Sequence, residues 1–287
     1  MLFTESIESF INYLITKDKS KATIRAYSLD LQSFNFFLEK KYNCPLYLDE
    51  IKSSDIEDYL FYLKSTRNLK TASRNRNLYI LRSFWNYAYK KKLCNWNITL
   101  EIEPLKMQQQ ERTFLTEQEF EELLQEIEQP LVKLVVFTLF YTGMRISECL
   151  NLQIEDVDLV DKVIHVKNGK GKKERFIPIN DNLHTKLKSY IESERPRVAT
   201  ATFFVTAKTG GLSDVYVNSI LREATKKLGW KKKVSAHILR HSFASNLIKK
   251  GVNLVHVQKL LGHSNLKVTS IYTHASLEDL SASINML

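Results

Sequence analysis

The chain has 287 residues, of which 44% are hydrophobic and 26% charged, and its 42 Lys and Arg against 32 Asp and Glu give a net charge of +10. This composition is globular, because disordered chains are poorer in apolar residues and collagens far richer in Gly and Pro. The length suits one large domain or two ordinary ones. The basic excess points to a polyanionic partner, most simply nucleic acid.

Secreted, membrane-spanning and disulfide-bonded proteins are disfavoured. The first ten residues lack the basic start and long apolar stretch of a secretory signal. The longest apolar run, 131–141, is interrupted by Lys133 and is too short to cross a bilayer. Cys44, Cys94 and Cys149 are widely spaced and form no CxxC pair, which argues against a disulfide framework or a cysteine zinc site. We therefore expect a cytoplasmic protein with no membrane contact.

Residues 1–97 predict an all-helical first domain. Apolar residues between Thr23 and Leu38 recur at three- and four-residue steps, as on one face of a helix. Ser54, followed by Asp55, is predicted to cap the start of a second helix that extends through residue 63. A third helix is predicted over 72–89. No alternating strand pattern is found in this part of the chain.

Residues 98–112 are predicted to be an interdomain linker, because they are polar and no apolar periodicity crosses them. The second domain, 113–287, begins with Thr116 and Glu119 at the spacing of a capping box. A buried helix is expected over 130–141, then strands at 163–166 and 175–179 joined through 168–171. A helix near 181–194, a short strand at 203–205 and further helices follow. The fold class expected is mainly α (α+β), with a small sheet in the second domain.

The positive charge is divided between the two predicted domains. Residues 1–105 carry a net charge of +4 and residues 106–287 of +6. A run of basic residues such as 222–233 can be a solvated surface and no more. However, two positive domains joined by a linker suggest a ligand that touches both, such as a DNA duplex held from two sides.

Three separated segments combine residue types that can act on a phosphate. The first is 141–148, in which a glycine ends a buried helix and Arg145 follows; the second is 237–241, within a helix, with His237 and Arg240; the third is 261–265, with His263, followed by Tyr272 nine residues later. In order and spacing these segments resemble the tyrosine recombinase family, specifically its compact, two-domain, Xer-like members. The resemblance extends over nearly the whole chain.

The resemblance implies a helical core-binding (SAM-like) DNA-binding domain, a linker and a catalytic domain, which match the three parts derived above. It also implies a catalytic set. By position, these residues are Arg145, in the context TGxRxSE; Lys170, between two glycines; His237 and Arg240, as HxxR; His263, in LGH; and Tyr272, the nucleophile.

Chemistry explains why these residue types occur together. The guanidinium groups of Arg145 and Arg240 suit the nonbridging oxygens of a phosphodiester, where charge accumulates during cleavage. Tyr272 would attack the phosphorus and leave a 3′-phosphotyrosyl bond and a free 5′ hydroxyl. A phenol with a pKa of about 10 needs help at neutral pH, which makes His237 the candidate base. His263 would donate to a nonbridging oxygen and Lys170 would protonate the leaving oxygen. No metal, ATP or other cofactor is required by this scheme.

Each residue also has a structural interpretation. A buried Arg145 beside Glu148 is often an ion pair that only stabilises the fold. Lys170 can be a solvated turn residue, and Tyr272 can be a packing residue. His237 and His241 are spaced as zinc ligands on a helix, but the HExxH pattern is absent. All six assignments would have to fail together for the resemblance to be accidental.

Candidate DNA contacts are less specific than the catalytic set. Arg74 and Arg76 lie at the start of the third predicted helix, where a helix N-terminus and two guanidinium groups can bind phosphate. Lys172 and Lys173 flank the predicted hairpin turn and are suitable for backbone contacts. The alternative for each is an exposed residue that contributes only to solubility.

The resemblance also implies the partners. These are double-stranded recombination sites with inverted arms, bound by a homotetramer on two sites or together with a related partner recombinase, which exchange strands through a Holliday junction. Leu277, Leu280, Ile284 and Leu287 form an apolar stripe if helical, and in the family such a segment docks on a neighbouring protomer. Dimer resolution, cointegrate resolution and integration or excision all remain open. The lack of an added arm-binding domain favours simple sites and resolution.

Two other classes of function are compatible with parts of the pattern. A type IB topoisomerase shares the chemistry but acts without pairing two DNA sites, and a noncatalytic DNA-binding regulator needs only the basic surfaces. Replacing Tyr272 by Phe separates the last class, because a recombinase loses its covalent DNA adduct and keeps specific binding.

Overall fold

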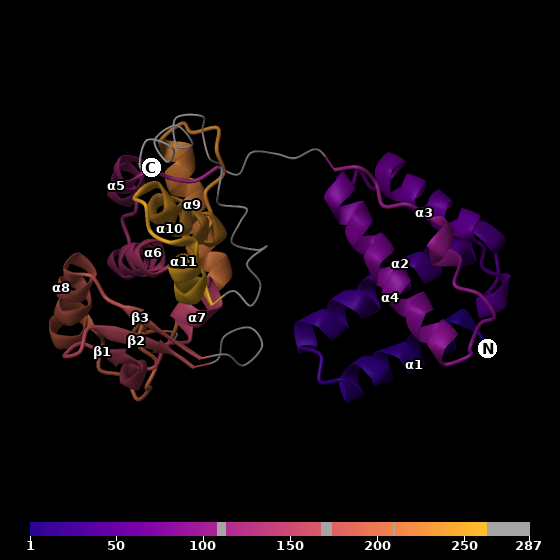
Figure 1. The fold of residues 1–287 in the computed structure, drawn as a ribbon, viewed down its shortest axis with the longest axis horizontal. Coiled ribbons are helices and arrows are strands. Elements are labelled where there is room, and N and C mark those ends of the chain that lie inside the picture. The colour runs from indigo at the N-terminus through magenta and orange to yellow at the C-terminus, as the bar shows by residue number, and fades with distance from the viewer. Residues whose placement is uncertain (108–112, 168–173, 209, 263–287) are drawn as a thin grey trace, which may run out of the picture. The chain divides into compact units, whose positions relative to one another are not determined.

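The computed structural model describes residues 1–107, 113–167, 174–208 and 210–262 (Figure 1). The chain divides into two compact units, Met1–Gln110 and Glu111–Leu287. Within the described ranges, no helix is both long enough and apolar enough to cross a membrane. The helices outnumber the strands in both units, and a small sheet occurs in the second, so the predicted fold class is confirmed.

The first unit is built from four helices: α1 (Phe3–Thr16), α2 (Lys21–Tyr42), α3 (Ser53–Ser65) and α4 (Thr71–Lys90), with short 3-10 helices at Leu48–Glu50 and Ile98–Glu101. Helix α1 was not predicted individually. Its buried Phe3 packs edge-on against Phe84 of α4, with ring centroids 5.4 Å apart, and stacks on Trp85 with 30° between the ring planes. The core of this unit combines such aromatic rings with a larger number of aliphatic side chains, mainly Leu and Ile.

Helix α3 begins earlier than predicted, at Ser53 with Lys52 as its N-cap, so the assignment of Ser54 as the cap is wrong. The reason is Asp55, whose carboxylate accepts a hydrogen bond from the Lys52 amide at 2.9 Å. This bond gives a partner to a backbone N–H group that would otherwise be unpaired at the helix start. The same buried carboxylate accepts bonds from Lys41 and Tyr42 of α2, both at 2.7 Å. Asp55 therefore joins α2 to α3.

Residues 98–105 belong to the first unit and pack on its helices. Ile102 is buried, and its carbonyl accepts a hydrogen bond from Arg82 of α4. The side-chain amide of Asn75 pairs with both backbone groups of Leu105, at 2.8 Å each. The predicted domain and linker limits stay predictions, but the described residues up to Leu105 are held on α4 by these bonds.

The second unit has seven helices in its described ranges: α5 (Glu117–Gln125), α6 (Pro130–Thr142), α7 (Ile146–Leu150), α8 (Asp181–Ser189), α9 (Asp214–Lys227), α10 (Ala236–Lys249) and α11 (Leu254–Leu261). The predicted capping box at the start of α5 is confirmed, because Thr116 and Glu119 exchange hydrogen bonds at 3.2 and 3.0 Å. A π-helical turn, Tyr190–Glu194, extends α8.

Three short strands form an antiparallel sheet in the order β1 (Val157–Asp158), β2 (Val163–Val166) and β3 (Arg175–Pro178). The two predicted strands, β2 and β3, are confirmed, with Val166 opposite Arg175. Strand β1 was not predicted, because two residues are too few to show a pattern. The segment 168–173 that connects β2 to β3 lies outside the described residues.

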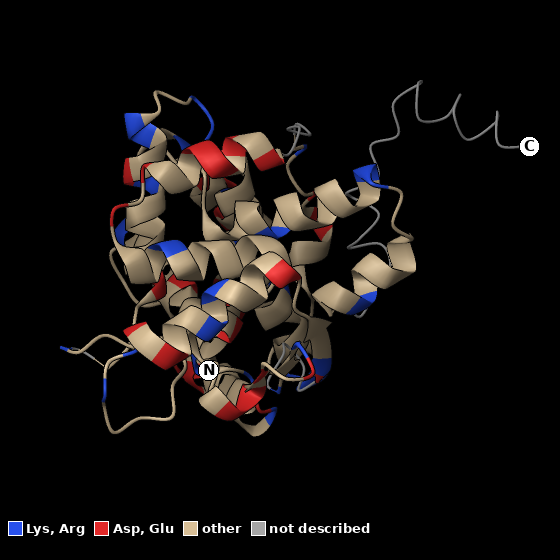
Figure 2. Cartoon of the chain, turned by 90° about the vertical axis from the view of Figure 1, so that its left-hand side faces the viewer, with Lys and Arg blue, Asp and Glu red and all other residues tan. Residues whose placement is uncertain are grey.

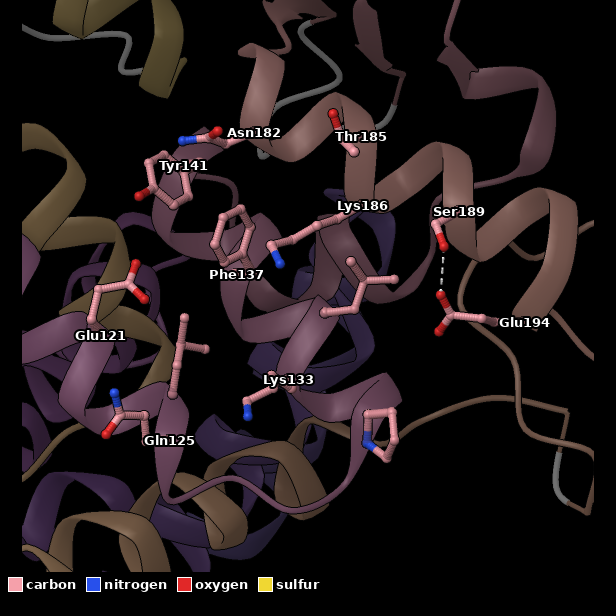
Figure 3. Close-up of a pocket in the computed structure, with 13 residues that line it drawn as sticks. Glu121, Gln125, Lys133, Phe137, Tyr141, Asn182, Thr185, Lys186, Ser189 and Glu194 are labelled. Carbon is pink, nitrogen blue, oxygen red and sulfur yellow. Dashed lines mark hydrogen bonds between the residues drawn. The ribbon is translucent and has the colours of Figure 1, made fainter.

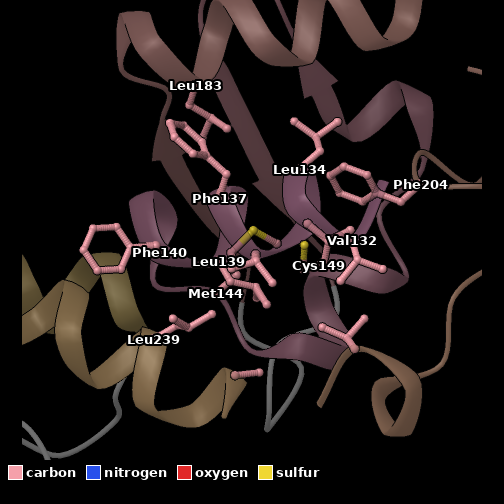
Figure 4. Packing of buried hydrophobic residues seen from close by; sticks show 14 of the residues in the cluster. Val132, Leu134, Phe137, Leu139, Phe140, Met144, Cys149, Leu183, Phe204 and Leu239 are labelled. Atoms are coloured by element: carbon pink, nitrogen blue, oxygen red, sulfur yellow. The ribbon is translucent and has the colours of Figure 1, made fainter. Parts of the chain in front are cut away.

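Helix α6 is the centre of the second unit and contacts α5, α7, α8, α9 and α10. Because it has neighbours on all sides, its sequence is apolar all round rather than striped. Figure 4 shows the side chains of Val132, Leu134 and Leu139 packed with Phe204 and Leu239 from segments far away in the sequence. The position where this helix ends is therefore fixed by the core.

The strand predicted at 203–205 is wrong. Only Thr202 forms an isolated bridge, with Gln153, and no ladder continues from it. The carbonyls of Thr200, Thr202 and Phe203 instead accept hydrogen bonds from the guanidinium of Arg195. The apolar run reflects burial of the Phe203 side chain and its neighbours in the core, which a single sequence cannot distinguish from a strand.

Candidate active site

Arg145 is held at a sharp turn between α6 and α7. Helix α6 ends at Gly143, which adopts a left-handed conformation with φ of +62° and donates its amide to Leu139 at 3.0 Å. Glycine suits this conformation because it has no Cβ. Arg145 then serves as the N-cap of α7, and 29% of its side chain is exposed. An arginine so placed is accessible to a phosphate while its backbone is fixed.

Glu148 positions the Arg145 side chain. Its carboxylate accepts the Arg145 backbone amide at 2.9 Å and the guanidinium at 2.6 Å, and only 5% of the glutamate side chain is exposed. Burial acts to raise the pKa of Glu148, but hydrogen bonds from Arg175 and from Arg145 outweigh it and bring the pKa to about 2. The carboxylate is therefore charged at neutral pH. The ion pair considered as a structural alternative at Arg145 is present, and it leaves the arginine partly exposed.

His237 and Arg240 lie within the first two turns of α10, whose N-cap Ser235 accepts the Ile238 amide at 3.4 Å. His237 is exposed, whereas Arg240 is buried, with 3% of its surface accessible. The guanidinium of Arg240 donates to the carbonyl of Gly143 at 2.7 Å and to the carbonyl of Leu261 at 2.8 Å. Arg240 therefore joins the turn that precedes Arg145 to the end of α11.

Helix α11 ends at Gly262, which again has a left-handed conformation, with φ of +66°. His263 follows directly, but His263 and Tyr272 lie outside the described residues, as do Lys170, Lys172 and Lys173. The structure thus places three of the six predicted catalytic residues. Arg240 contacts the backbone two residues before Arg145, and His237 is on the same helical turn as Arg240.

Arg175 belongs to the same group of residues, although its sequence context predicts only a strand. Its guanidinium donates to the two carboxylate oxygens of Glu148 at 3.2 and 2.6 Å and to the Leu260 carbonyl at 2.8 Å. The signal available in the sequence was its position two residues before Ile177. Side chains two apart on a strand share a face, and here Ile177 is buried whereas Phe176 between them is exposed. An arginine on the inner face of a strand needs buried partners.

The predicted DNA contacts in the first unit have partners within the chain. Arg74 and Arg76 lie near the start of α4, which is the fourth helix rather than the third. Arg76 is exposed and forms an ion pair with Asp30 at 3.0 Å, and Arg74 contacts Thr71 at 3.4 Å. Figure 2 shows basic and acidic segments on the same helices. A role of these arginines in binding DNA stays a prediction.

A metal site is not built by the described residues, among which no group of three His, Cys, Asp or Glu could hold an ion. His237 and His241 differ in environment: the first is exposed, and the second is buried with Nδ1 at 3.3 Å from the Ser245 hydroxyl.

A cavity of about 770 Å³ lies elsewhere in the second unit, between α5, α6 and α8 (Figure 3). Lys186 reaches over the ring of Phe137, 5.0 Å from its centroid, and Ser189 donates to Glu194 at 2.9 Å. None of the predicted catalytic residues lines this cavity. The candidate site is instead the group of side chains around Arg240.

Comparison with known proteins identifies the family. The phage integrase family model matches residues 113–278, and the phage integrase N-terminal SAM-like domain model matches residues 7–92. The chain belongs to the phage integrase family. A tyrosine recombinase of Thermosipho africanus is 33% identical over 281 residues, which cover 94% of this chain and 95% of that protein. Members of this family cleave and rejoin DNA, and the chain is accordingly a tyrosine-type DNA recombinase.

Two further relatives agree with this assignment. The tyrosine recombinase XerC of Leptospira interrogans is 32% identical over 285 residues, or 96% of this chain and 90% of that protein. The crystal structure of the XerH site-specific recombinase bound to palindromic difH substrate has a TM-score of 0.75 and 27% identity, covering 94% of this chain and 81% of that one. The family predicted from the three sequence segments is thus confirmed.

Proposed function

We propose that this recombinase cleaves DNA with Tyr272 as nucleophile and with Arg145, Lys170, His237, Arg240 and His263 as the remaining catalytic set. The phenolic oxygen of Tyr272 forms a bond to phosphorus as the bond from phosphorus to the 5′ oxygen breaks. His237 takes the phenolic proton and Lys170 supplies a proton to the leaving 5′ oxygen. Attack by a 5′ hydroxyl reverses these steps and rejoins the strand.

The observation that carries the proposal is the pair of hydrogen bonds from Arg240 to the carbonyls of Gly143 and Leu261. They bring together the turn holding Arg145, the helix start holding His237 and the end of α11, after which His263 follows. Three segments distant in the sequence thus converge on one arginine. Two guanidinium groups in one region suit the two nonbridging oxygens of a scissile phosphate.

The proposal is tested by locating the covalent bond. Incubation with a nicked duplex carrying a recombination site, in which the released strand diffuses away, traps the protein–DNA adduct. We expect protease digestion and mass spectrometry to find the nucleotide on the peptide that contains Tyr272. An adduct on another residue, or cleavage with no covalent adduct, would contradict the mechanism. Relaxation of supercoiled DNA without exchange between two sites would favour the topoisomerase alternative.

The partners we propose are duplex sites with inverted arms, bound by four protomers that exchange strands through a Holliday junction in the cytoplasm. The palindromic substrate of the XerH structure supports inverted arms by similarity. If each protomer docks its C-terminal segment on the next protomer, the contacts run head to tail. Such contacts form a closed ring when the rotation from one protomer to the next divides a full turn evenly. The apolar residues of that segment are Leu277, Leu280, Ile284 and Leu287.

Deletion of the residues after Ser276 is expected to leave binding of one protomer to one arm and to weaken assembly on two sites by at least tenfold. Burial of even one leucine side chain stabilises a contact by about 1.5–3 kcal/mol, and this deletion removes several. Gel-shift ladders of the full and shortened chains measure the effect. A shortened chain with the same ladder would rule out this segment as the link between protomers.

A further inference from the structure

Arg175 has a buried, charged side chain that donates hydrogen bonds to three acceptor atoms on two residues. Only 8% of its side chain is exposed, compared with 29% for Arg145. Each of its three nitrogens donates a hydrogen bond, two to the Glu148 carboxylate and one, from Nε, to the Leu260 carbonyl. Since all three nitrogens are engaged by acceptors of the chain, we consider the effect of Arg175 on the reaction through these acceptors.

Its partners belong to the segments that the proposed chemistry requires. Glu148 holds the guanidinium of Arg145 at 2.6 Å. The carbonyls of Leu260 and Leu261, adjacent in the chain, accept from Arg175 and Arg240 respectively. Arg175 is also the first residue of β3, the strand that follows the connection containing Lys170. One side chain therefore contacts two of these segments, at Glu148 and at Leu260, and begins the strand that follows a third.

The contact with the end of α11 is tight. A Cβ atom at Gly262 would lie 3.0 Å from Cδ of Arg175 and 3.3 Å from its Nε and Nη1. Because such distances are shorter than ordinary contacts, a methyl group would force the arginine or the helix end to move. Two features thus favour glycine at position 262: the left-handed backbone, and the Arg175 side chain that occupies the space of a Cβ.

Charge gives Arg175 a role beyond packing. Arg145 and Glu148 alone form a neutral pair. The Glu148 carboxylate would then cancel the positive charge with which Arg145 attracts the phosphate. With Arg175 on the other side of the same carboxylate, the group of three retains one positive charge in excess. In an interior of low dielectric this difference acts strongly on a nearby anion.

We propose that Arg175 is a positioning residue of the recombinase site, which neutralises Glu148 so that Arg145 keeps its positive charge for the phosphate, and which fixes the end of α11 relative to β3. The inference rests on the proposed function, because it assigns Arg145 to the phosphate. It identifies a residue outside the six catalytic positions whose loss affects chemistry without direct contact with DNA.

The test is a double-mutant cycle of Arg175→Met and Glu148→Gln, measured by single-turnover formation of the covalent adduct at saturating protein, with DNA affinity from gel shifts. R175M leaves Glu148 facing Arg145 alone, and we expect the rate to fall by about 100-fold while affinity changes less than about threefold. E148Q/R175M restores the excess charge and is expected to react at least about tenfold faster than R175M. Arg175→Lys, which keeps the charge, should fall between wild type and R175M.

The outcomes separate a charge effect from packing. If Arg175 acts only by packing, the double variant is no faster than R175M, which overturns the inference. If R175M does not fold, the double variant replaces it, because that variant has no uncompensated buried carboxylate. Its rate of adduct formation is then compared with that of E148Q. A rate less than about tenfold lower supports the inference, and a rate more than about 100-fold lower contradicts it. A wild-type chain that forms no adduct overturns the proposed function and this inference with it, whereas an R175M rate equal to wild type overturns the inference alone.

Discussion

Replacing Arg240 by Lys is expected to reduce the rate of strand cleavage by about 10³, the scale of losing a preorganised donor at a developing negative charge. Lysine keeps the charge but has no planar fork, so it cannot hold a phosphate oxygen and two carbonyls in the same geometry. The carbonyls of Gly143 and Leu261, which Arg240 contacts at 2.7 and 2.8 Å, would lose their donors. Each buried unsatisfied group costs about 1–3 kcal/mol, so we also expect lower stability.

Tyr272→Phe is the reference for this experiment, because it removes the nucleophile and leaves Arg240 in place. We expect that variant to form no adduct, to bind its site as wild type does and to melt at the wild-type temperature. Arg240→Lys should form the adduct about 10³-fold more slowly than wild type and also melt several degrees lower. Single-turnover cleavage and thermal unfolding of the three proteins make the comparison. Adduct formation by Arg240→Lys within about tenfold of wild type would contradict the role of Arg240 at the phosphate.

The local part of the site could be predicted from sequence because its signals are local. Pro130 begins α6 and Gly143 ends it, and both residues mark helix limits through their own backbone preferences. The catalytic assignments came from the resemblance of three short segments, and of the glycine-flanked Lys170, to the tyrosine recombinase family. That spacing predicts which residues are needed, and the structure adds that Arg240 joins two of the segments through main-chain carbonyls.

The long-range part could not be predicted. Glu148 and Leu260 are 27 and 85 residues away from Arg175 in the chain, and no pattern in one sequence relates positions so far apart. The wrong strand at 203–205 has a similar cause. Its Phe203 carbonyl accepts a hydrogen bond from Arg195 and its Val205 carbonyl accepts one from the Tyr190 hydroxyl, so side chains took acceptors that a neighbouring strand would have used.

Helix starts show the same limit on a smaller scale. Thr116 caps α5 as predicted, because its hydroxyl and the Glu119 carboxylate both find backbone amides. At α3, Asp55 satisfies the Lys52 amide and also binds Lys41 and Tyr42, so the start moves away from Ser54. Glu119 also binds Lys232, so a tertiary partner does not by itself displace a cap. At α3 the carboxylate is shared by three donors, and one sequence does not show which donors will meet it.

Gly143→Ala should destabilise the second unit by about 2–4 kcal/mol, because two costs add at this position. A Cβ there would lie 2.3 Å from Cδ1 of Phe243 and 3.0 Å from Cδ2 of Leu261, and overpacking of this kind costs about 1–3 kcal/mol. The left-handed φ of +62° adds about 1 kcal/mol for a residue with a Cβ. The carbonyl that accepts from Arg240 would shift with the backbone, so cleavage should weaken as well.

Gly251→Ala is the matched control, because Gly251 also has a left-handed backbone, with φ of +80°, but no atom lies within 4 Å of its added Cβ. That variant isolates the backbone cost of about 1 kcal/mol. Hydrogen exchange of the amides in α6 and α10 measures both variants, since a chain with two compact units need not unfold in one step. Equal losses of protection in the two variants would show that Phe243 and Leu261 move aside without cost, and the turn before Arg145 would then be less firmly fixed than these distances indicate.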